Sequence, residues 1–301
     1  MSYADHFVYA SYMDESFDMR QAGLFAVGGL IAKGPAIFDL ESKWERLLRR
    51  SDIDIEYYKA SECELGTGQF KKFVKRERFP TPEEKRILHE ISCEFIRLIT
   101  SEFVVGHGIN VVQDDFYEVT KDPAAKAVLG DTPYKLAYDL AMVQCAWIMK
   151  DLERKTAAAI QPWNRVPRPH VSFVCDEHET HSPSASVAYL KLKEGNPEAA
   201  QYMASYSYAD EKLFPVLQAA DAMVYEVRRS AKLSLGIRTG EWREQFRILD
   251  RCKRIGLIQI ANRESLQNVV NNHKPGEPFN LSAIMEQVFH ADIKFNLYGS
   301  L

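Results

Sequence analysis

Acidic residues follow apolar, strand-like segments at two distant places in the sequence. One Asp-Glu pair begins at Asp14, after the segment 6–13, and another begins at Asp176, after the segment 170–175. Strand ends lie at the edge of a sheet, where α/β proteins commonly place their active sites. A single acidic residue there is usually a loop cap. Two such pairs predict that carboxylates from separate segments meet in one site.

Two further segments carry polar residues of the same kind. Glu62 closes the sequence Lys59-Ala-Ser-Glu62, and Gln218 and Asp221 lie in an otherwise apolar stretch with a helical pattern. Residues three apart on a helix share one face, so Gln218 and Asp221 are expected side by side. Because a buried, unpaired carboxylate is costly, Asp221 requires a cation, a hydrogen-bonding partner or solvent.

The four carboxylates Asp14, Glu62, Asp176 and Asp221 predict a site for divalent metal ions. Gathered carboxylates repel one another, and some would take up protons. Two Mg²⁺ or Mn²⁺ ions would neutralise them, and hard oxygen ligands are those that Mg²⁺ prefers. Two ions held about 3.5–4 Å apart activate water and stabilise the leaving oxygen in phosphodiester hydrolysis. This chemistry predicts a metal-dependent phosphodiesterase.

Two neutral or cationic side chains are expected to assist this site. Lys59 is predicted to contact the scissile phosphate or to steady a carboxylate, with an ordinary surface lysine as the alternative. Gln218 is predicted to orient a ligand carboxylate or a water molecule. Both are therefore candidate catalytic residues, together with the four carboxylates.

Five motifs in order give the chain a resemblance to a known family. They are Tyr12-Met13-Asp14-Glu15-Ser16, Phe25-Ala26-Val27-Gly28-Gly29, Lys59-Ala60-Ser61-Glu62, Asp176, and Leu217-Gln218-Ala219-Ala220-Asp221, spread over residues 6–230. They resemble the bacterial and phage-associated domain-of-unknown-function family thirty-eight hundred, which is regarded as ribonuclease H-like. The resemblance implies a nuclease whose metal-binding carboxylates are Asp14, Glu62, Asp176 and Asp221.

Two features depart from that family's pattern. Phe17 and Asp18 follow the first motif where the family often has glycine, so the turn after the first strand must differ. Glu62 precedes the long helix expected from Pro82, whereas the second acid of ribonuclease H-like folds more often lies on a helix. Glu62 therefore has the weakest support of the four carboxylates.

The order of apolar patterns predicts an α/β protein. The expected fold is a ribonuclease H-like mixed sheet with an N-terminal antiparallel hairpin, flanked by helices. Strands are expected at 6–13, 24–32, 103–112, 170–175, 202–208 and 255–260, and helices at 38–50, 82–99, 133–153, 184–193, 215–229 and 242–252. The segment 55–63 is expected to be partly extended, and Gly28 and Gly29 suggest a bulge or a close backbone approach.

The sequence also predicts how the chain divides. Residues 1–230 are expected to form the ribonuclease H-like domain, and residues 231–301 a C-terminal helical extension packed on it. Within this extension, residues 265–301 show no clear periodicity.

The formal net charge of -4 gives no general attraction to a polyanion, so nucleic acid, the expected partner, would have to bind a local basic patch. Candidate patches are Lys71, Lys72, Lys75, Arg76 and Arg78, and separately Arg228, Arg229 and Lys232, although each run is more simply a solvated face.

Composition predicts a cytoplasmic protein that does not enter a membrane. The cysteines, at positions 63, 93, 145, 175 and 252, are scattered and form no CxxC pair, as is typical of reduced thiols. The N-terminus lacks the pattern of a secretory signal, and no apolar run reaches membrane-spanning length.

Alternative chemistries remain open. His178 and His181, beside Asp176, would suit zinc, manganese or iron, or one of them could act as a general base, although a polar surface loop is the favoured interpretation. Two other functions use the same fold or acids. One is a catalytically weak module that binds nucleic acid or protein, and the other is a hydrolase of small phosphate esters.

Overall fold

A six-stranded mixed sheet forms the centre of the protein. The computed structural model describes residues 8–17, 23–75, 79–102, 104–159, 168–177, 182–252 and 255–273. Its strands are β1 (Val8–Phe17), β2 (Leu24–Lys33), β3 (Val105–Val112), β4 (His170–Asp176), β5 (Met203–Ala209) and β6 (Ile255–Ala261), in the order β5-β4-β1-β2-β3-β6. β2 runs antiparallel to β1 and β3, whereas the pairs β1–β4, β4–β5 and β3–β6 are parallel. The predicted α/β class, mixed sheet and opening hairpin are confirmed.

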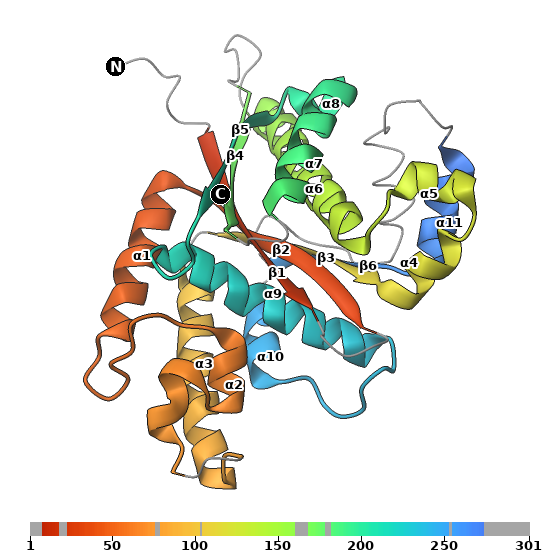
Figure 1. Cartoon of the computed structure of the whole chain (residues 1–301). Helices are drawn as coiled ribbons and strands as arrows, with labels where there is room; N and C mark the ends of the chain where they lie inside the picture. Colours follow the sequence, from red (N-terminus) through yellow and green to blue (C-terminus); the bar gives the residue numbers. More distant parts are fainter. Residues whose placement is uncertain are drawn as a thin grey trace, which may run out of the picture.

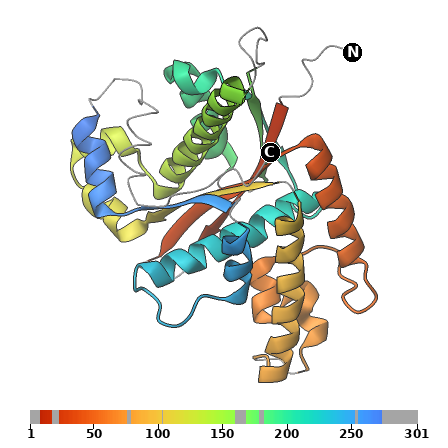
Figure 2. The same cartoon turned by 180° about the vertical axis from the view of Figure 1, so that it is seen from behind.

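Helices cover both faces of this sheet. They are α1 (Gly34–Leu48), α2 (Ala60–Leu65), the 3-10 helix η2 (Gly68–Phe73), α3 (Pro82–Ser101), α4 (Gln113–Val119), α5 (Pro123–Leu129), α6 (Pro133–Ala159), α7 (Ser182–Gly195), α8 (Pro197–Ala200), α9 (Pro215–Ser234), α10 (Glu244–Arg251) and α11 (Arg263–Asn272). α9 crosses one face of the sheet, with α1, α3 and α10 beyond it, and α6 and α7 lie over the other face (Figure 1). The view from behind shows β6 at the edge of the sheet, beside α11 (Figure 2).

Close packing in the centre of the sheet explains the glycine pair in β2. A Cβ atom on Gly29 would lie 1.7 Å from the carbonyl oxygen of Tyr12, and one on Gly28 would lie 2.3 Å from that of His107. The pairing of β2 with both neighbours has no register shift in this region. Of the two predicted explanations, the close backbone approach is therefore the correct one.

Two elements show how local sequence determines structure here. Thr81 caps α3 through a capping box with Glu84, in agreement with the predicted helix start. α9 is buried on nearly all sides, because it lies between the sheet and the helices α1, α3 and α10. A helix in that position needs apolar or small residues around its whole circumference, which explains its alanine-rich sequence.

The structure corrects several sequence-based boundaries. β1 does not end at Asp14 but continues to Phe17, because β2 pairs with it as far as that residue. α2 occupies part of the segment that was expected to be extended. α11 lies partly in the segment that shows no clear periodicity. It was not predicted, because Leu266 and Val269 are its only buried residues and form no long apolar stripe. The helices α4, α5 and α8 were not predicted, because each has only four to seven residues.

Residues after Ser230 join the main body of the protein wherever the structure describes them. β6 extends the central sheet beside β3, α10 packs on α3, and α11 packs on α4 and α5. None of the helices in the described ranges combines the length and apolar character that crossing a lipid bilayer requires.

Candidate active site

Asp14 lies where the parallel part of the sheet ends. Its strand pairs with β4 only as far as Met13 and Cys175, so Asp14 lies one residue beyond the last pair and next to Asp176, the end of β4. Neighbouring residues of a strand point to opposite faces. Met13 belongs to the core on the α6 side, so Asp14 faces α9.

Asp221 reaches the same region from α9. Its Oδ2 accepts a hydrogen bond of 2.8 Å from the backbone N–H of Ala60, at the start of α2. Asp14 and Asp221 are 2% and 4% exposed, so both carboxylates are buried. Each needs a partner that balances its charge, because a buried carboxylate without a partner is unfavourable.

The Asp14 carboxylate is only half satisfied. Its Oδ1 accepts a hydrogen bond of 2.7 Å from the backbone N–H of Glu15, whereas its Oδ2 is buried without a hydrogen-bond partner. Burial raises the pKa of Asp14 well above its usual value; Lys59 opposes the shift, and Asp221, Glu15 and Glu211 add to it. When ionised, Asp14 therefore adds negative charge that the described side chains do not fully balance, and this is why its carboxyl holds a proton more readily than usual.

Lys59 is the cation of this site. Its Nζ donates to both carboxylate oxygens of Glu211, at 2.6 Å and 2.7 Å. Burial alone would lower the pKa of Lys59, but the negative charges of Asp221, Asp14 and Glu211 raise it. Lys59 therefore contacts a carboxylate, which is one of the two roles that the sequence suggested for it.

Glu211 is the residue of this site that the sequence analysis missed. Its backbone N–H donates to Asp176 Oδ1 at 3.0 Å. Burial raises the pKa of its carboxyl to about 7; Lys59 opposes the shift, and Asp221 and Asp176 add to it. The signal was available, because Asp210 and Glu211 follow β5 directly. Each of the parallel strands is thus followed or ended by an acidic pair. The pairs are Asp14-Glu15 after the part of β1 that pairs with β4, Asp176-Glu177 at the end of β4, and Asp210-Glu211 after β5.

Glu15 and Asp176 complete the group of acids at this end of the parallel strands. We call this group, which consists of Asp14, Glu15, Asp176, Glu211 and Asp221, the acidic edge. Glu15 faces α6, where the Tyr138 hydroxyl donates to its Oε2 at 3.0 Å. Burial raises the pKa of Glu15 to about 7, against the effect of the Tyr138 hydrogen bond. Burial also raises the pKa of Asp176, although the N–H of Glu211 and the charge of Lys59 oppose this shift. Both carboxyls therefore contribute to the excess of acid.

Glu62 lies at the margin of this cluster. Its Oε1 accepts a hydrogen bond of 3.3 Å from the Tyr57 hydroxyl, and its Oε2 accepts one of 3.1 Å from the backbone N–H of Gln69. Neither of these hydrogen bonds joins Glu62 to Asp14, Asp221 or Glu211. The structure thus brings Asp14, Asp176 and Asp221 together with Lys59, and leaves Glu62 to one side on α2.

Gln218 positions the backbone around the site. Its Oε1 accepts hydrogen bonds from Trp44 Nε1 at 3.0 Å and from the backbone N–H of Tyr58 at 2.9 Å. Its Nε2 donates to the backbone oxygen of Glu211 at 3.0 Å. These bonds hold the residue before Lys59 and the backbone of Glu211, so Gln218 acts here through other residues rather than on a ligand.

The proposed metal site shows no preformed coordination. Among the residues that the structure describes, no three His, Cys, Asp or Glu side chains are gathered closely enough to hold a metal ion. His178 and His181 lie outside the described residues.

Comparison with other proteins adds nothing to this site. No protein-family model matches the sequence, and a search of curated proteins finds no match. The chemistry of the site therefore rests on its own residues.

Proposed function

We propose that this protein is a metal-dependent phosphodiester hydrolase, a nuclease, whose active site is the acidic edge around Asp14. The observation that supports this most directly is the buried Asp14 Oδ2, which has no partner inside a cluster rich in carboxylates. A cation at this edge would satisfy that oxygen and offset the repulsion. The antiparallel β1–β2–β3 unit continued by parallel strands also supports a ribonuclease H-like fold, as the resemblance implies.

The donor set fits Mg²⁺ or Mn²⁺, since it consists of carboxylate oxygens. Asp14, Asp176 and Asp221 are the first candidates for ligands. Glu62 remains a candidate for the fourth, and Glu211 is a second candidate because it lies against Lys59 and next to Asp176. Two divalent ions, when bound, would supply water activation and stabilisation of the leaving oxygen.

The protein's own side chains have complementary tasks. The Lys59 ammonium offsets the carboxylates, and with substrate bound it would donate to a non-bridging phosphate oxygen. Gln218 holds the backbone next to Lys59 and the backbone of Glu211 in place through the hydrogen bonds described above. Burial of Asp14 and Asp221 excludes water from their carboxylates, which strengthens their attraction for a cation.

Substitution of the buried acids tests this proposal. Asp14→Asn and Asp221→Asn should lower cleavage on the order of a thousandfold, because metal activation contributes several kcal/mol and each 1.36 kcal/mol is tenfold in rate. Purified variants would be assayed on single-stranded DNA, duplex DNA, RNA and a hybrid, with Mg²⁺, Mn²⁺ or chelator. The matched control is Glu177→Gln, an exposed acid next to Asp176. Full activity in either Asn variant would contradict the proposal.

A catalytically weak binding module of the same fold is the second candidate. It is favoured by the position of Lys59, whose ammonium already occupies the place of a cation among the carboxylates. Oligonucleotide binding by the wild-type protein without cleavage under any metal condition would select this alternative.

A further inference from the structure

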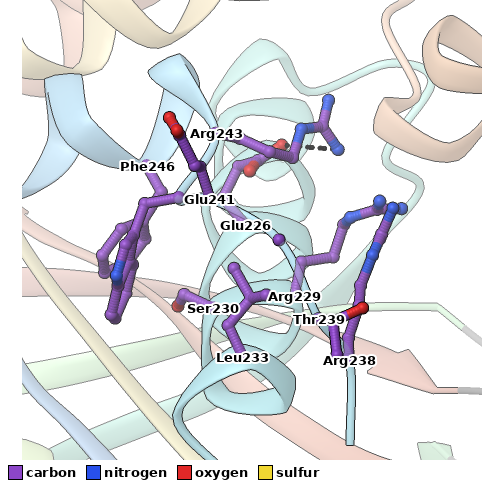
Figure 3. A pocket seen from close by; sticks show the side chains of 11 residues that line it. Glu226, Arg229, Ser230, Leu233, Arg238, Thr239, Glu241, Arg243 and Phe246 are labelled. Atoms are coloured by element: carbon purple, nitrogen blue, oxygen red, sulfur yellow. Dashed lines mark ion pairs between the residues drawn. The ribbon is translucent and has the colours of Figure 1, made fainter. Parts of the chain in front are cut away.

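Three arginines line a pair of neighbouring hollows near the C-terminal half of α9. Arg229, Arg238 and Arg243 border both hollows, which have volumes of about 370 Å³ and 210 Å³. Lys85 and His89 of α3 also line the larger one. We call these two hollows together the arginine pocket; Figure 3 shows the smaller of them. The pocket concentrates positive charge on a chain whose formal net charge is -4.

Two of the arginines are partly neutralised by acids. The Arg229 and Arg243 guanidinium groups lie 2.6 Å and 2.8 Å from the Glu64 carboxylate, and Arg243 lies 3.3 Å from Glu226. Glu226 is a weak counter-charge, because burial raises its pKa to about 7 against the pull of Arg243 and Arg229. Arg229 Nε, which is buried, has no hydrogen-bond acceptor.

Arg238 and Lys85 lack an acidic partner. Both are exposed, and neither side chain forms an ion pair or hydrogen bond with any residue that the structure describes. In Figure 3 the side chains of Arg229 and Arg238 extend in the same direction. Adjacent guanidinium groups repel one another unless an anion lies between them, and planar guanidinium forks match the oxygens of phosphate.

We propose that the arginine pocket binds a phosphate group of a nucleic-acid strand whose reacting phosphate lies at the acidic edge around Asp14. This inference rests on the proposed function and deepens it, because it assigns a second contact to the substrate. Asp221 and Arg229 are eight residues apart on α9, which is about 12 Å at 1.5 Å per residue. Along the axis of a duplex that lies parallel to α9, where each nucleotide of a strand advances about 3.4 Å, this distance covers three or four nucleotides.

An aromatic wall favours a nucleic acid over a free phosphate ion. Trp242 lines the smaller hollow, is 42% exposed and stacks on Phe246 with ring centroids 4.6 Å apart. Exposed aromatic rings beside cationic side chains provide stacking surfaces for nucleobases. The pocket therefore offers contacts for a base as well as for a phosphate.

Arg238→Ala provides the test, because Arg238 is exposed and its removal breaks no ion pair among the described residues. Binding of a fluorescently labelled oligonucleotide would be measured with chelator present, so that cleavage does not interfere, over a salt series. We expect Kd to rise roughly tenfold, and the slope of log K against log salt to lose about 0.7–0.9. Lys85→Met should act in the same direction. The matched control is Arg251→Ala on α10, whose guanidinium pairs with Glu244 at 3.3 Å; neither of these two residues lines either hollow.

Each outcome decides the inference. Unchanged Kd and salt slope in Arg238→Ala would overturn it, whether or not the protein cleaves nucleic acid. Arg238-dependent binding of inorganic phosphate, measured by calorimetry, without oligonucleotide binding would overturn the assignment to a strand. Arg238-dependent oligonucleotide binding in a protein that shows no metal-dependent cleavage would support the pocket and refute the nuclease. The two proposals therefore fail separately.

Discussion

The two halves of α9 lie in surroundings of opposite charge. Near its N-terminal half, Asp221 belongs to the acidic edge, where Lys59 faces Asp14 and Glu211 together. In its C-terminal half, Arg229 and Arg243 share the Glu64 carboxylate, and Arg243 also lies 3.3 Å from Glu226. Arg238 adds a third guanidinium there, which forms no ion pair with the described residues. One end of the helix thus has too few cations, and the other has more cations than acids.

The pKa shifts follow from this difference. Burial raises the pKa of Asp14, and its acidic neighbours raise it further. Burial alone would also raise the pKa of Glu64, but Arg243 and Arg229 hold it below its usual value. Burial acts in the same direction on both carboxyls, and the sign of the neighbouring charges decides the opposite directions of their pKa shifts. A protein that retains an unbalanced acidic cluster gives up stability there, as expected of a functional site.

Lys59→Met should produce the largest change in stability. It leaves the carboxylates of the acidic edge without their cation, and we expect the free energy of unfolding to fall by about 2–3 kcal/mol. This is less than the 3–5 kcal/mol for a fully buried pair, because Lys59 is partly exposed. The loss should be greater at pH 8.5 than at pH 5.5, where protonation relieves the repulsion. Urea unfolding in chelator measures it.

The control for this variant is Lys212→Met, an exposed lysine next to Glu211 in sequence. If the acidic edge binds divalent ions, Mg²⁺ should restore part of the stability that Lys59→Met loses. An equal loss at both pH values would show that the charge of Lys59 is not what stabilises the edge.

Glu64→Gln tests the opposite end of the helix. It removes a carboxylate that two arginines share, and we expect a loss of about 1–2 kcal/mol at pH 7. Because the folded pKa of Glu64 lies below its unfolded value, this contribution is present above about pH 4.5. It is lost as the pH falls through the folded pKa. The matched change Glu241→Gln, in a side chain that is 88% exposed, should cost less than about 0.5 kcal/mol.

Asp14→Asn should give the smallest change and the opposite sign. The raised pKa of Asp14 means that the folded wild type loses stability as the pH rises above the unfolded value of about 4. The variant lacks this loss, so in chelator at pH 8.5 we expect it to be more stable by about 1 kcal/mol. Near pH 4 the two proteins should unfold alike. A variant less stable than wild type at pH 8.5 would contradict the unbalanced charge that we assign to this edge.

Parts of the fold were predictable because their signals are local. The capping box of Thr81 and Glu84 begins α3 at the expected residue, and two apolar segments joined by a short connection predicted β1 and β2 as a hairpin. α11 and the short helices α4 and α5 were not predictable in the same way. Their positions depend on packing against each other and on β6, which a short sequence window does not contain.

The sequence by itself determined the α/β class and the presence of acidic residues at strand ends. Which acids meet was decided only by tertiary structure. Parallel pairing of β4 with β1 and with β5 brings Asp176 beside Asp14 and Glu211, and the packing of α9 on the sheet brings in Asp221. Glu62 has the expected residue type and spacing, but the direction of α2 turns it toward Tyr57. Residue type is local, whereas the meeting of side chains remote in sequence depends on strand order and helix packing.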